Sequence, residues 1–306
     1  MLFPELAFAT PRKLPRPAEL RGRVAVLDVA FASEASGGGF EKITRPFIDG
    51  LGPRLAMWVD HHDHALHEAY KDDPRFVLRT KAQHGACPEM VTPEVVARAG
   101  AVETIVCHTD FDGLASAAKW IRGGVECYPG ADDDARAIDT RIGKPSSVAE
   151  RMDRAIRAAG REHSILGLIV RHLATGLEDA SLWGPIDAAA DKLAAIETET
   201  RKVAQGYVVR DARTPLVGAG KPRPRVAMLK LSGGPRYDKT MLLLLGQERA
   251  DIALLVDRDT LTLAAPFDSG LNFLELFKLS GGMPTLVSVP AKRLSEVLDR
   301  MGLEDI

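Results

Sequence analysis

The segment LAMWVDHHDH (residues 55–64) is an apolar run that ends in a cluster of Asp and His residues. Two further segments have the same arrangement: VAVLDVAF (24–31) carries Asp28, and ETIVCHTDFDG (103–113) ends in one His and two Asp residues. Short apolar runs are typical of strands buried in a parallel sheet, whose carboxyl ends lie at one shared edge. The three segments therefore predict an α/β fold in which polar side chains gather at one edge of a parallel sheet.

The rest of the chain divides into segments of different composition. Residues 1–21 form a Pro-rich N-terminal arm, and residues 22–184 contain the three apolar runs and several helical segments. Residues 185–206 start with a proline, which is favoured in the first turn of a helix, and are expected to form a linker helix. Residues 207–306 predict a smaller α/β domain, in which VDRDT (256–260) is the turn of a hairpin.

The charge balance excludes one class of function. Lys and Arg total 40 and Asp and Glu total 42, so the net charge is −2 and binding of nucleic acid through overall positive charge is excluded. The three cysteines are too few for a disulfide framework and fit a reducing cytoplasm. No stretch approaches the roughly 20 apolar residues that span a bilayer, and the N-terminal region lacks the apolar core of a signal peptide. The sequence therefore predicts a cytoplasmic protein without a membrane partner.

The polar residues that end the apolar runs suit a metal site. Asp110 and Asp112 are two positions apart, so on an extended segment both face the same side. Carboxylates together with imidazoles suit Mn²⁺, Mg²⁺, Fe²⁺ or Zn²⁺, and two such ions about 3.5–4 Å apart would activate a water and stabilise a phosphoryl transition state. Any one of these Asp residues alone is typical of a helix cap or a turn. Their combination in three segments favours a shared metal site.

These motifs resemble those of the DHH phosphoesterases, a family named after the Asp-His-His found here at residues 60–62. HTDFDGLASA (108–117) is similar to the family's Asp-x-Asp motif, and Asp28 matches its single Asp after a strand. QHGACPEMV (83–91) resembles the small-residue helix start that follows the DHH strand, and Asp139, followed by Thr, resembles the fourth motif.

The order of the motifs differs from the family's order. In the family the Asp-x-Asp motif precedes the DHH motif. In this sequence the Asp-x-Asp motif follows the DHH motif, as in a circularly permuted domain. Permutation can preserve a site, because strand ends converge whatever their order along the chain. The resemblance thus implies that residues 22–184 are a permuted DHH-like catalytic domain.

The resemblance also implies roles for individual residues. The cofactor would be two Mn²⁺ ions, with Mg²⁺ or Co²⁺ as alternatives. The implied metal ligands are Asp28, Asp60, His61, Asp110, Asp112 and Asp139. The implied catalytic residues are His61, His62 and His108. Among these, His62 would contact the substrate phosphate or the leaving oxygen, and His108 would be a further ligand or a phosphate contact.

The second domain resembles the DHH-associated substrate-binding domain. Its Gly-Gly-Gly-His-Pro loop is matched by Ser280-Gly281-Gly282-Met283-Pro284, where Met283 replaces the family's His and cannot donate a hydrogen bond. The implied substrate contacts are Lys278, Ser280, Gly281 and Gly282. The alternative role for this domain is to form a homodimer.

Taken as a whole, the resemblance implies a metal-dependent phosphoesterase that hydrolyses a phosphodiester or phosphomonoester of a nucleotide or short oligonucleotide. Metal-bound water would be the nucleophile. A RecJ-like exonuclease acting on longer single strands is the second enzymatic interpretation, and a pyrophosphatase is the third. The alternative from a different class is a non-catalytic, nucleotide-binding regulatory protein on the same fold.

Overall fold

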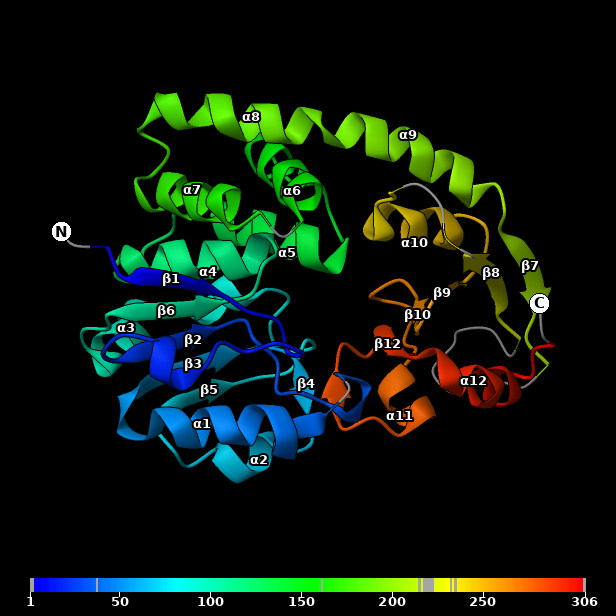
Figure 1. The fold of residues 1–306 in the computed structure, drawn as a ribbon, viewed down its shortest axis with the longest axis horizontal. Coiled ribbons are helices and arrows are strands. Elements are labelled where there is room, and N and C mark those ends of the chain that lie inside the picture. Colours follow the sequence, from blue (N-terminus) through cyan, green and yellow to red (C-terminus); the bar gives the residue numbers. More distant parts are fainter. Residues whose placement is uncertain are drawn as a thin grey trace. The chain divides into compact units, whose positions relative to one another are not determined.

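Figure 1 shows the computed structural model of the chain, which describes residues 3–36, 38–160, 162–213, 216, 223–231, 233 and 236–304. The chain divides into two units. The first comprises Met1–Ala32 and Gly38–Leu193, and the second comprises Ser33–Gly37 and Ala194–Ile306. Each unit has its own sheet and helices, and the first sheet is parallel. The predicted class, a parallel-sheet α/β domain with a second, smaller α/β domain, is therefore confirmed.

The first unit is built on a five-stranded sheet with the order β1-β6-β2-β3-β5, in which all neighbouring strands run parallel. Its strands are β1 (Glu5–Phe8), β2 (Val24–Leu27), β3 (Leu55–Asp60), β5 (Phe76–Leu78) and β6 (Thr104–Cys107). The three apolar runs of the sequence form β2, β3 and β6, which are adjacent at the centre of the sheet. Since they are parallel, their carboxyl ends lie side by side at one edge.

The N-terminal segment contributes the edge strand of this sheet. Glu5 pairs with Thr104 and Phe8 with Cys107, and the Glu5 N–H donates to the carbonyl of Glu103 at 2.9 Å. The prolines of the segment lie outside the strand, at residue 4 and from residue 11 onward, so every strand residue keeps its N–H for pairing. Part of the predicted Pro-rich arm is therefore integrated in the first unit.

Helices and single turns fill the rest of the first unit. The helices are α1 (Arg45–Leu51), α2 (His67–Tyr70), α3 (Pro93–Ala99), α4 (Phe111–Ile121), α5 (Ala131–Thr140), α6 (Ser147–Ala159), α7 (His163–Ala174) and α8 (Trp183–Asp191). The shorter elements are a two-residue strand β4 (Asp63–His64), a π-helical turn η3 (Phe40–Thr44) and the 3₁₀ turns η1 (Pro17–Glu19), η4 (Gly52–Arg54), η5 (Cys87–Met90) and η6 (Ala180–Leu182).

Different helices cover the two faces of this sheet. On β2, Val24 and Val26 belong to the apolar cluster that includes α1, whereas Ala25 and Leu27 belong to the cluster that includes α4 and α7. Figure 1 shows α1 and α2 on one side of the sheet and α4 and α7 on the other. Because successive side chains of a strand point to opposite faces, a strand covered on both sides is apolar throughout. This explains why the strands appear in the sequence as continuous apolar runs.

Residues 145–205 are largely helical and contain α6, α7, α8 and α9 (Leu193–Ala204). Local signals set its first helix start: the Ser146 hydroxyl accepts a hydrogen bond from the N–H of Ala149 at 3.3 Å, and Gly160 follows the last residue of α6. Helix α6 packs against α8. The long Pro-initiated segment is thus two helices, α8 and α9, and the division between the two units falls at the first residues of α9.

The second unit has a five-stranded mixed sheet with the order β12-β10-β9-β8-β7. Its strands are β7 (Val208–Asp211), β8 (Arg225–Leu231), β9 (Ile252–Asp257), β10 (Thr260–Ala264) and β12 (Leu286–Pro290). The pair β8 and β9 is parallel and the other neighbours are antiparallel. Its remaining elements are α10 (Lys239–Gln247), α11 (Phe273–Phe277), α12 (Leu294–Met301), the short strand β11 (Gly281–Gly282) and the 3₁₀ turns η2 (Glu34–Ser36) and η7 (Ala291–Arg293). Asp257 pairs with Thr260, which confirms the hairpin predicted at VDRDT.

Two further features concern the length of the helices and the state of the cysteines. Within the described part of the chain, no helix is both long and apolar enough to cross a bilayer. The cysteines Cys87, Cys107 and Cys127 are buried free thiols.

Candidate metal centre

Acidic and His side chains converge at the carboxyl ends of the three central strands. Asp28 follows β2, the Asp-His-His segment ends β3, and Asp110 follows β6 at the start of α4. The described residues form three groups whose potential ligand atoms all lie within 4.8 Å of one another: Asp28, His61 and His62; Asp28, His108 and Asp110; and His61, Asp112 and Asp139. The DHH and Asp-x-Asp segments are thus brought together although their order along the chain is exchanged.

Asp28 is the residue shared by two of these groups. Its side chain is buried, and neither carboxylate oxygen has a hydrogen-bond partner among the described residues. Burial raises the pKa of this carboxyl well above its usual range, and the carboxylates of Asp112 and Asp110 raise it further. Its backbone has φ of 58°, a left-handed conformation that is uncommon outside glycine and recurs at functional sites. Asp28 is therefore a desolvated carboxyl group held in a strained position without the hydrogen bonds that such a group normally requires.

His61 presents one ring nitrogen to the cluster. Its Nδ1 lies 3.0 Å from the carbonyl oxygen of His84, which can only accept, so Nδ1 carries a proton. Nε2 lies 3.1 Å from Asp28 Oδ1 and 3.2 Å from Asp112 Oδ2. Metal-binding histidines are typically oriented in this way, with the other nitrogen donating to a carbonyl or carboxylate.

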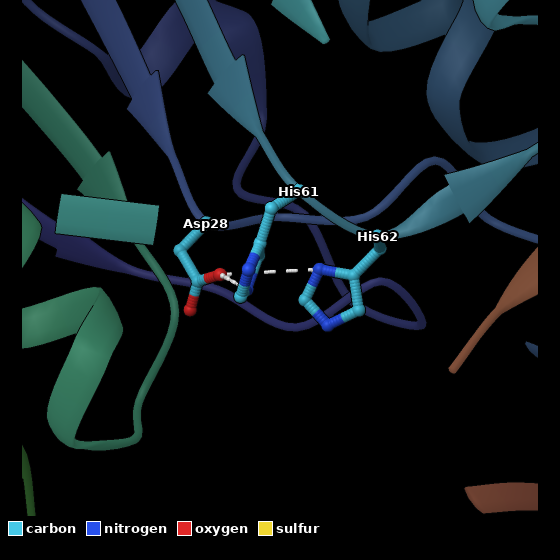
Figure 2. A group of neighbouring side chains, drawn as sticks. All are labelled: Asp28, His61 and His62. Carbon is cyan, nitrogen blue, oxygen red and sulfur yellow. Dashed lines mark ion pairs between the residues drawn. The ribbon is translucent and has the colours of Figure 1, made fainter. Parts of the chain in front are cut away.

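His62 is held by Asp60. Its Nδ1 lies 2.8 Å from Asp60 Oδ1 and 3.9 Å from Asp28 Oδ1. Figure 2 shows the rings of His61 and His62 both next to the carboxylate of Asp28 at the end of β2. Burial alone would raise the pKa of Asp60, but the His62 ring outweighs this effect and lowers it. Asp60 itself lies outside the three groups, so in this arrangement its contact orients His62.

Asp110 has two roles at the start of α4. Its Oδ1 accepts the N–H of Gly113 at 3.3 Å as the N-cap of the helix, and its Oδ2 lies 2.6 Å from His108 Nδ1. The same Nδ1 lies 3.7 Å from Asp28 Oδ2. Partial burial lowers the pKa of His108, but Asp110 and Asp28 outweigh it and raise this pKa to about 10. A Cβ on Gly113 would lie 2.8 Å from the His108 carbonyl oxygen, so the glycine of the Asp-x-Asp-Gly motif permits this close approach.

Asp112 and Asp139 complete the third group. Asp112 is buried in the first turn of α4, and its Oδ2 accepts the N–H of Cys87 at 3.3 Å. Asp139 lies near the end of α5, and its Oδ2 accepts a short hydrogen bond from the Nζ of Lys81. The acidic run at residues 132–134 lies at the opposite end of α5, outside the three groups.

Lys81 was not among the residues singled out in the sequence. The residue is 2% exposed, and its Nζ lies 2.8 Å from His61 Nε2. Burial alone would lower the pKa of Lys81, but the carboxylates of Asp139, Asp112 and Asp28 outweigh it and hold this pKa above its usual range. Two protons cannot face each other across 2.8 Å, so the ammonium donates and the imidazole accepts.

The other residues missed in the sequence act through their backbone. The carbonyl of His84 orients His61, and the N–H of Cys87 binds Asp112. Both lie within residues 83–91, which the resemblance marked only for small side chains. No motif identifies a backbone carbonyl or amide as part of a site, and Lys81 lies outside every motif, so the sequence offers no signal for these three residues.

The predicted substrate-binding residues belong to the second unit, whereas the Asp and His cluster belongs to the first. Lys278 ends α11 in a left-handed conformation, with φ of 52°. The N–H and the hydroxyl of Ser280 both lie within hydrogen-bond distance of Glu34 Oε2, at 3.2 and 2.7 Å. Gly281 and Gly282 form the short strand β11. A phosphate would therefore compete with Glu34 for the donors of Ser280.

The cluster fits a divalent cation on its own chemistry. The buried oxygens Asp28 Oδ1, Asp28 Oδ2 and Asp60 Oδ2 have no hydrogen-bond partner among the described residues, and a cation would satisfy those of Asp28 directly. Carboxylate oxygens mixed with imidazole nitrogens are donors that first-row divalent ions accept. The Asp and His groups could therefore hold a metal ion.

Comparison with known proteins does not extend this conclusion. Neither a protein-family model nor a curated protein matches the chain. The likeness to the DHH phosphoesterases therefore rests on its motifs alone and stays a prediction.

Proposed function

We propose that this protein is a metal-dependent phosphoesterase, similar to the DHH family, that hydrolyses a phosphate ester of a nucleotide or short oligonucleotide. One observation carries the proposal. The two oxygens of Asp28 are buried without hydrogen-bond partners among the described residues, at the point where the DHH and Asp-x-Asp segments meet. A structural carboxylate would have acquired hydrogen bonds, whereas a metal ligand keeps its lone pairs for the ion.

The residues around Asp28 suit hydrolysis by activated water. Asp28, His108 and Asp110 would hold the ion, for which Mn²⁺ is our choice and Mg²⁺ or Co²⁺ are alternatives. When bound, such an ion polarises a phosphoryl oxygen and lowers the pKa of a bound water. His62, positioned through Nδ1 by Asp60, keeps Nε2 for the substrate phosphate or the leaving oxygen. The nucleotide character of the substrate rests on the family resemblance.

A second candidate is a non-catalytic nucleotide-binding protein on the same fold. The observation that favours it is the ion pair of Lys81 with Asp139, because this ammonium neutralises part of the clustered negative charge without any metal. The unpartnered oxygens of Asp28 favour the enzyme over this candidate.

The test uses a variant that removes a ligand charge but keeps local hydrogen bonding. Asp110→Asn retains an oxygen for the Gly113 N–H. This variant should lower Mn²⁺-dependent hydrolysis by about 100-fold or more, because a metal centre contributes several kcal/mol to the transition state. The control is Asp133→Asn, an exposed carboxylate on α5 outside the three groups.

Turnover should be measured on three substrates: a 5′-phosphorylated dinucleotide, a longer single strand and pyrophosphate. The short substrate should be cleaved fastest, and preference for the long strand would instead indicate a RecJ-like exonuclease. Near-wild-type turnover by Asp110→Asn would show that the cluster is not the catalytic site. Mn²⁺ binding by the wild type without hydrolysis of any substrate would favour the non-catalytic candidate.

A further inference from the structure

The ammonium of Lys81 lies where the third group of ligand atoms would hold a cation. That group consists of His61, Asp112 and Asp139, whose ligand atoms all lie within 4.8 Å of one another. Lys81 Nζ donates to Asp139 Oδ2 and lies 2.8 Å from the Nε2 lone pair of His61. The ammonium thus makes direct contact with two of the three side chains that would bind an ion there.

An ammonium and a divalent ion exclude each other at this position. Ligand atoms bind first-row ions at about 2.0–2.2 Å, so an ion bound by His61 Nε2 and Asp139 Oδ2 would overlap the Lys81 nitrogen. Two like charges a few ångströms apart also repel strongly where water is excluded. Only one of the two cations can therefore occupy the third group.

The structure favours the lysine as the resident cation. Lys81 is buried, and its backbone N–H donates to Asp63 Oδ2 at 3.2 Å, which anchors the residue next to the DHH segment. Moving the ammonium away would break its ion pair with Asp139 and leave a charged group to find a new partner in the interior, a costly change.

The second group is in the opposite situation. Among the described residues, the ion pairs of Asp28 and Asp110 are with histidines alone, and no lysine or arginine pairs with this group. Asp28 contributes two buried oxygens that have no hydrogen-bond partner among the described residues. A divalent ion would therefore supply the missing positive charge in the second group, whereas Lys81 already supplies it in the third group.

We propose that Lys81 takes the place of one of the two metal ions expected from the DHH resemblance, so that each chain binds a single divalent ion through Asp28, His108 and Asp110. This inference rests on the proposed function in one respect, namely that the cluster binds a metal. A lysine ammonium supplies charge and hydrogen bonds but cannot activate a bound water as a Lewis acid does. Lys81 thus sets the metal content of the centre and positions His61 and Asp139.

The test counts metal ions in the full-length protein with Mn²⁺ as the probe. Lys81→Met removes the ammonium and keeps a flexible side chain of similar length. The matched control is Lys119→Met, because Lys119 is also a buried lysine of the first unit, paired with Asp132 and with the Pro88 carbonyl, outside the three groups. Elemental analysis and titration calorimetry should give one Mn²⁺ per chain for the wild type and the control, and two for Lys81→Met.

Electron paramagnetic resonance gives a second measurement that does not depend on activity. The wild type should show the hyperfine signal of an isolated Mn²⁺, and Lys81→Met the broadened signal of a spin-coupled pair. Two coupled ions in the wild type would overturn the inference while leaving the proposed metal-dependent function intact. A single ion in folded Lys81→Met would also overturn it.

Two precautions keep the outcomes distinct. If Lys81→Met does not fold, Lys81→Gln replaces it, and the ion count of the wild type decides the question without any variant. If no protein binds Mn²⁺ at the cluster, both the inference and the proposed function fail. That result differs from the wild type binding two ions, which contradicts the inference alone.

Discussion

Replacing Asp28 by Asn should stabilise the metal-free protein and abolish its stabilisation by metal. At neutral pH the Asp28 carboxylate lies within 4.8 Å of the Asp110 ligand oxygen, and its own two oxygens have no hydrogen-bond partner among the described residues. At an effective dielectric constant of about 20, two unit charges at 4.8 Å repel by about 3.5 kcal/mol. The positive charge on His108 offsets part of this repulsion.

The expected gain follows from these opposing contributions. Removing the charge of Asp28 should raise the free energy of unfolding of the metal-free protein by about 1–3 kcal/mol, the usual cost of an unsatisfied buried group. For a unit of this size, this gain corresponds to an increase of about 3–10 °C in melting temperature. Burial raises the pKa of Asp28, so in the wild type this penalty exists above the unfolded pKa of about 3.9. The difference between Asp28→Asn and the wild type should therefore shrink as the pH falls toward 4.

The assay is thermal unfolding monitored by circular dichroism, with EDTA and with saturating Mn²⁺. A ligand present at 100 times its dissociation constant stabilises a protein by about 2.7 kcal/mol. This stabilisation by Mn²⁺ should be present in the wild type and absent in Asp28→Asn. Asn tolerates the left-handed conformation at this position, whereas Asp28→Ala should lose about 1–2 kcal/mol of the gain. As a control, Asp153→Asn should destabilise the protein, since Asp153 is a buried carboxylate paired with Arg157.

Two results would refute this reasoning. One is a lower melting temperature for metal-free Asp28→Asn than for the wild type, which would mean that Asp28 is a structural residue with favourable contacts. The other is an undiminished Mn²⁺ shift in the variant, which would show that the ion binds elsewhere.

Two other predictions concern the surroundings of the site and the helical layer. Gly113→Ala should destabilise the protein by about 1–3 kcal/mol and weaken Mn²⁺ binding, because the new Cβ would lie 2.8 Å from the His108 carbonyl oxygen. An unchanged free energy of unfolding and an unchanged Mn²⁺ affinity by calorimetry would contradict this close approach. His172 is fully buried against Trp183, and burial lowers its pKa. Below about pH 6.5 the unfolded state therefore binds a proton at this residue more readily than the native state does. His172→Phe should therefore reduce the loss of stability on acidification by up to about 1.4 kcal/mol per pH unit, and equal pH dependence in urea unfolding of both proteins would exclude a lowered pKa.

Much of the first unit could be predicted from short windows of sequence. The runs that form β2, β3 and β6 are apolar throughout because helices cover both faces of the sheet, and this local property identifies them as strands of a parallel sheet. The N-cap at Ser146 and the hairpin turn between Asp257 and Thr260 likewise depend on a few neighbouring residues. The convergence of Asp28, the DHH segment and the Asp-x-Asp segment was expected from the shared edge of parallel strands, and the structure brings them together.

The edge strand β1 could not be predicted in this way. Its first residue is exposed and the other three are half-buried, without the alternation of a strand that has one buried face, and its pairing partner β6 lies about a hundred residues further along the chain. A short segment surrounded by prolines is typical of an irregular arm. It can be identified as a strand only when a partner strand with a free edge is known. Its assignment therefore required the order of strands in the folded sheet.

The local pattern of apolar runs and the acidic and His residues that end them is sufficient to predict the class of fold and the edge at which the site lies. The composition of that site depends on contacts between distant segments. Lys81 meets His61 across 20 positions of sequence and Asp139 across 58, and its ammonium is held there by burial and by opposite charges that converge only after folding. Whether a cation in the cluster is a metal ion or a lysine is thus decided by tertiary structure, because it depends on which side chains share a space rather than on which residues adjoin in sequence.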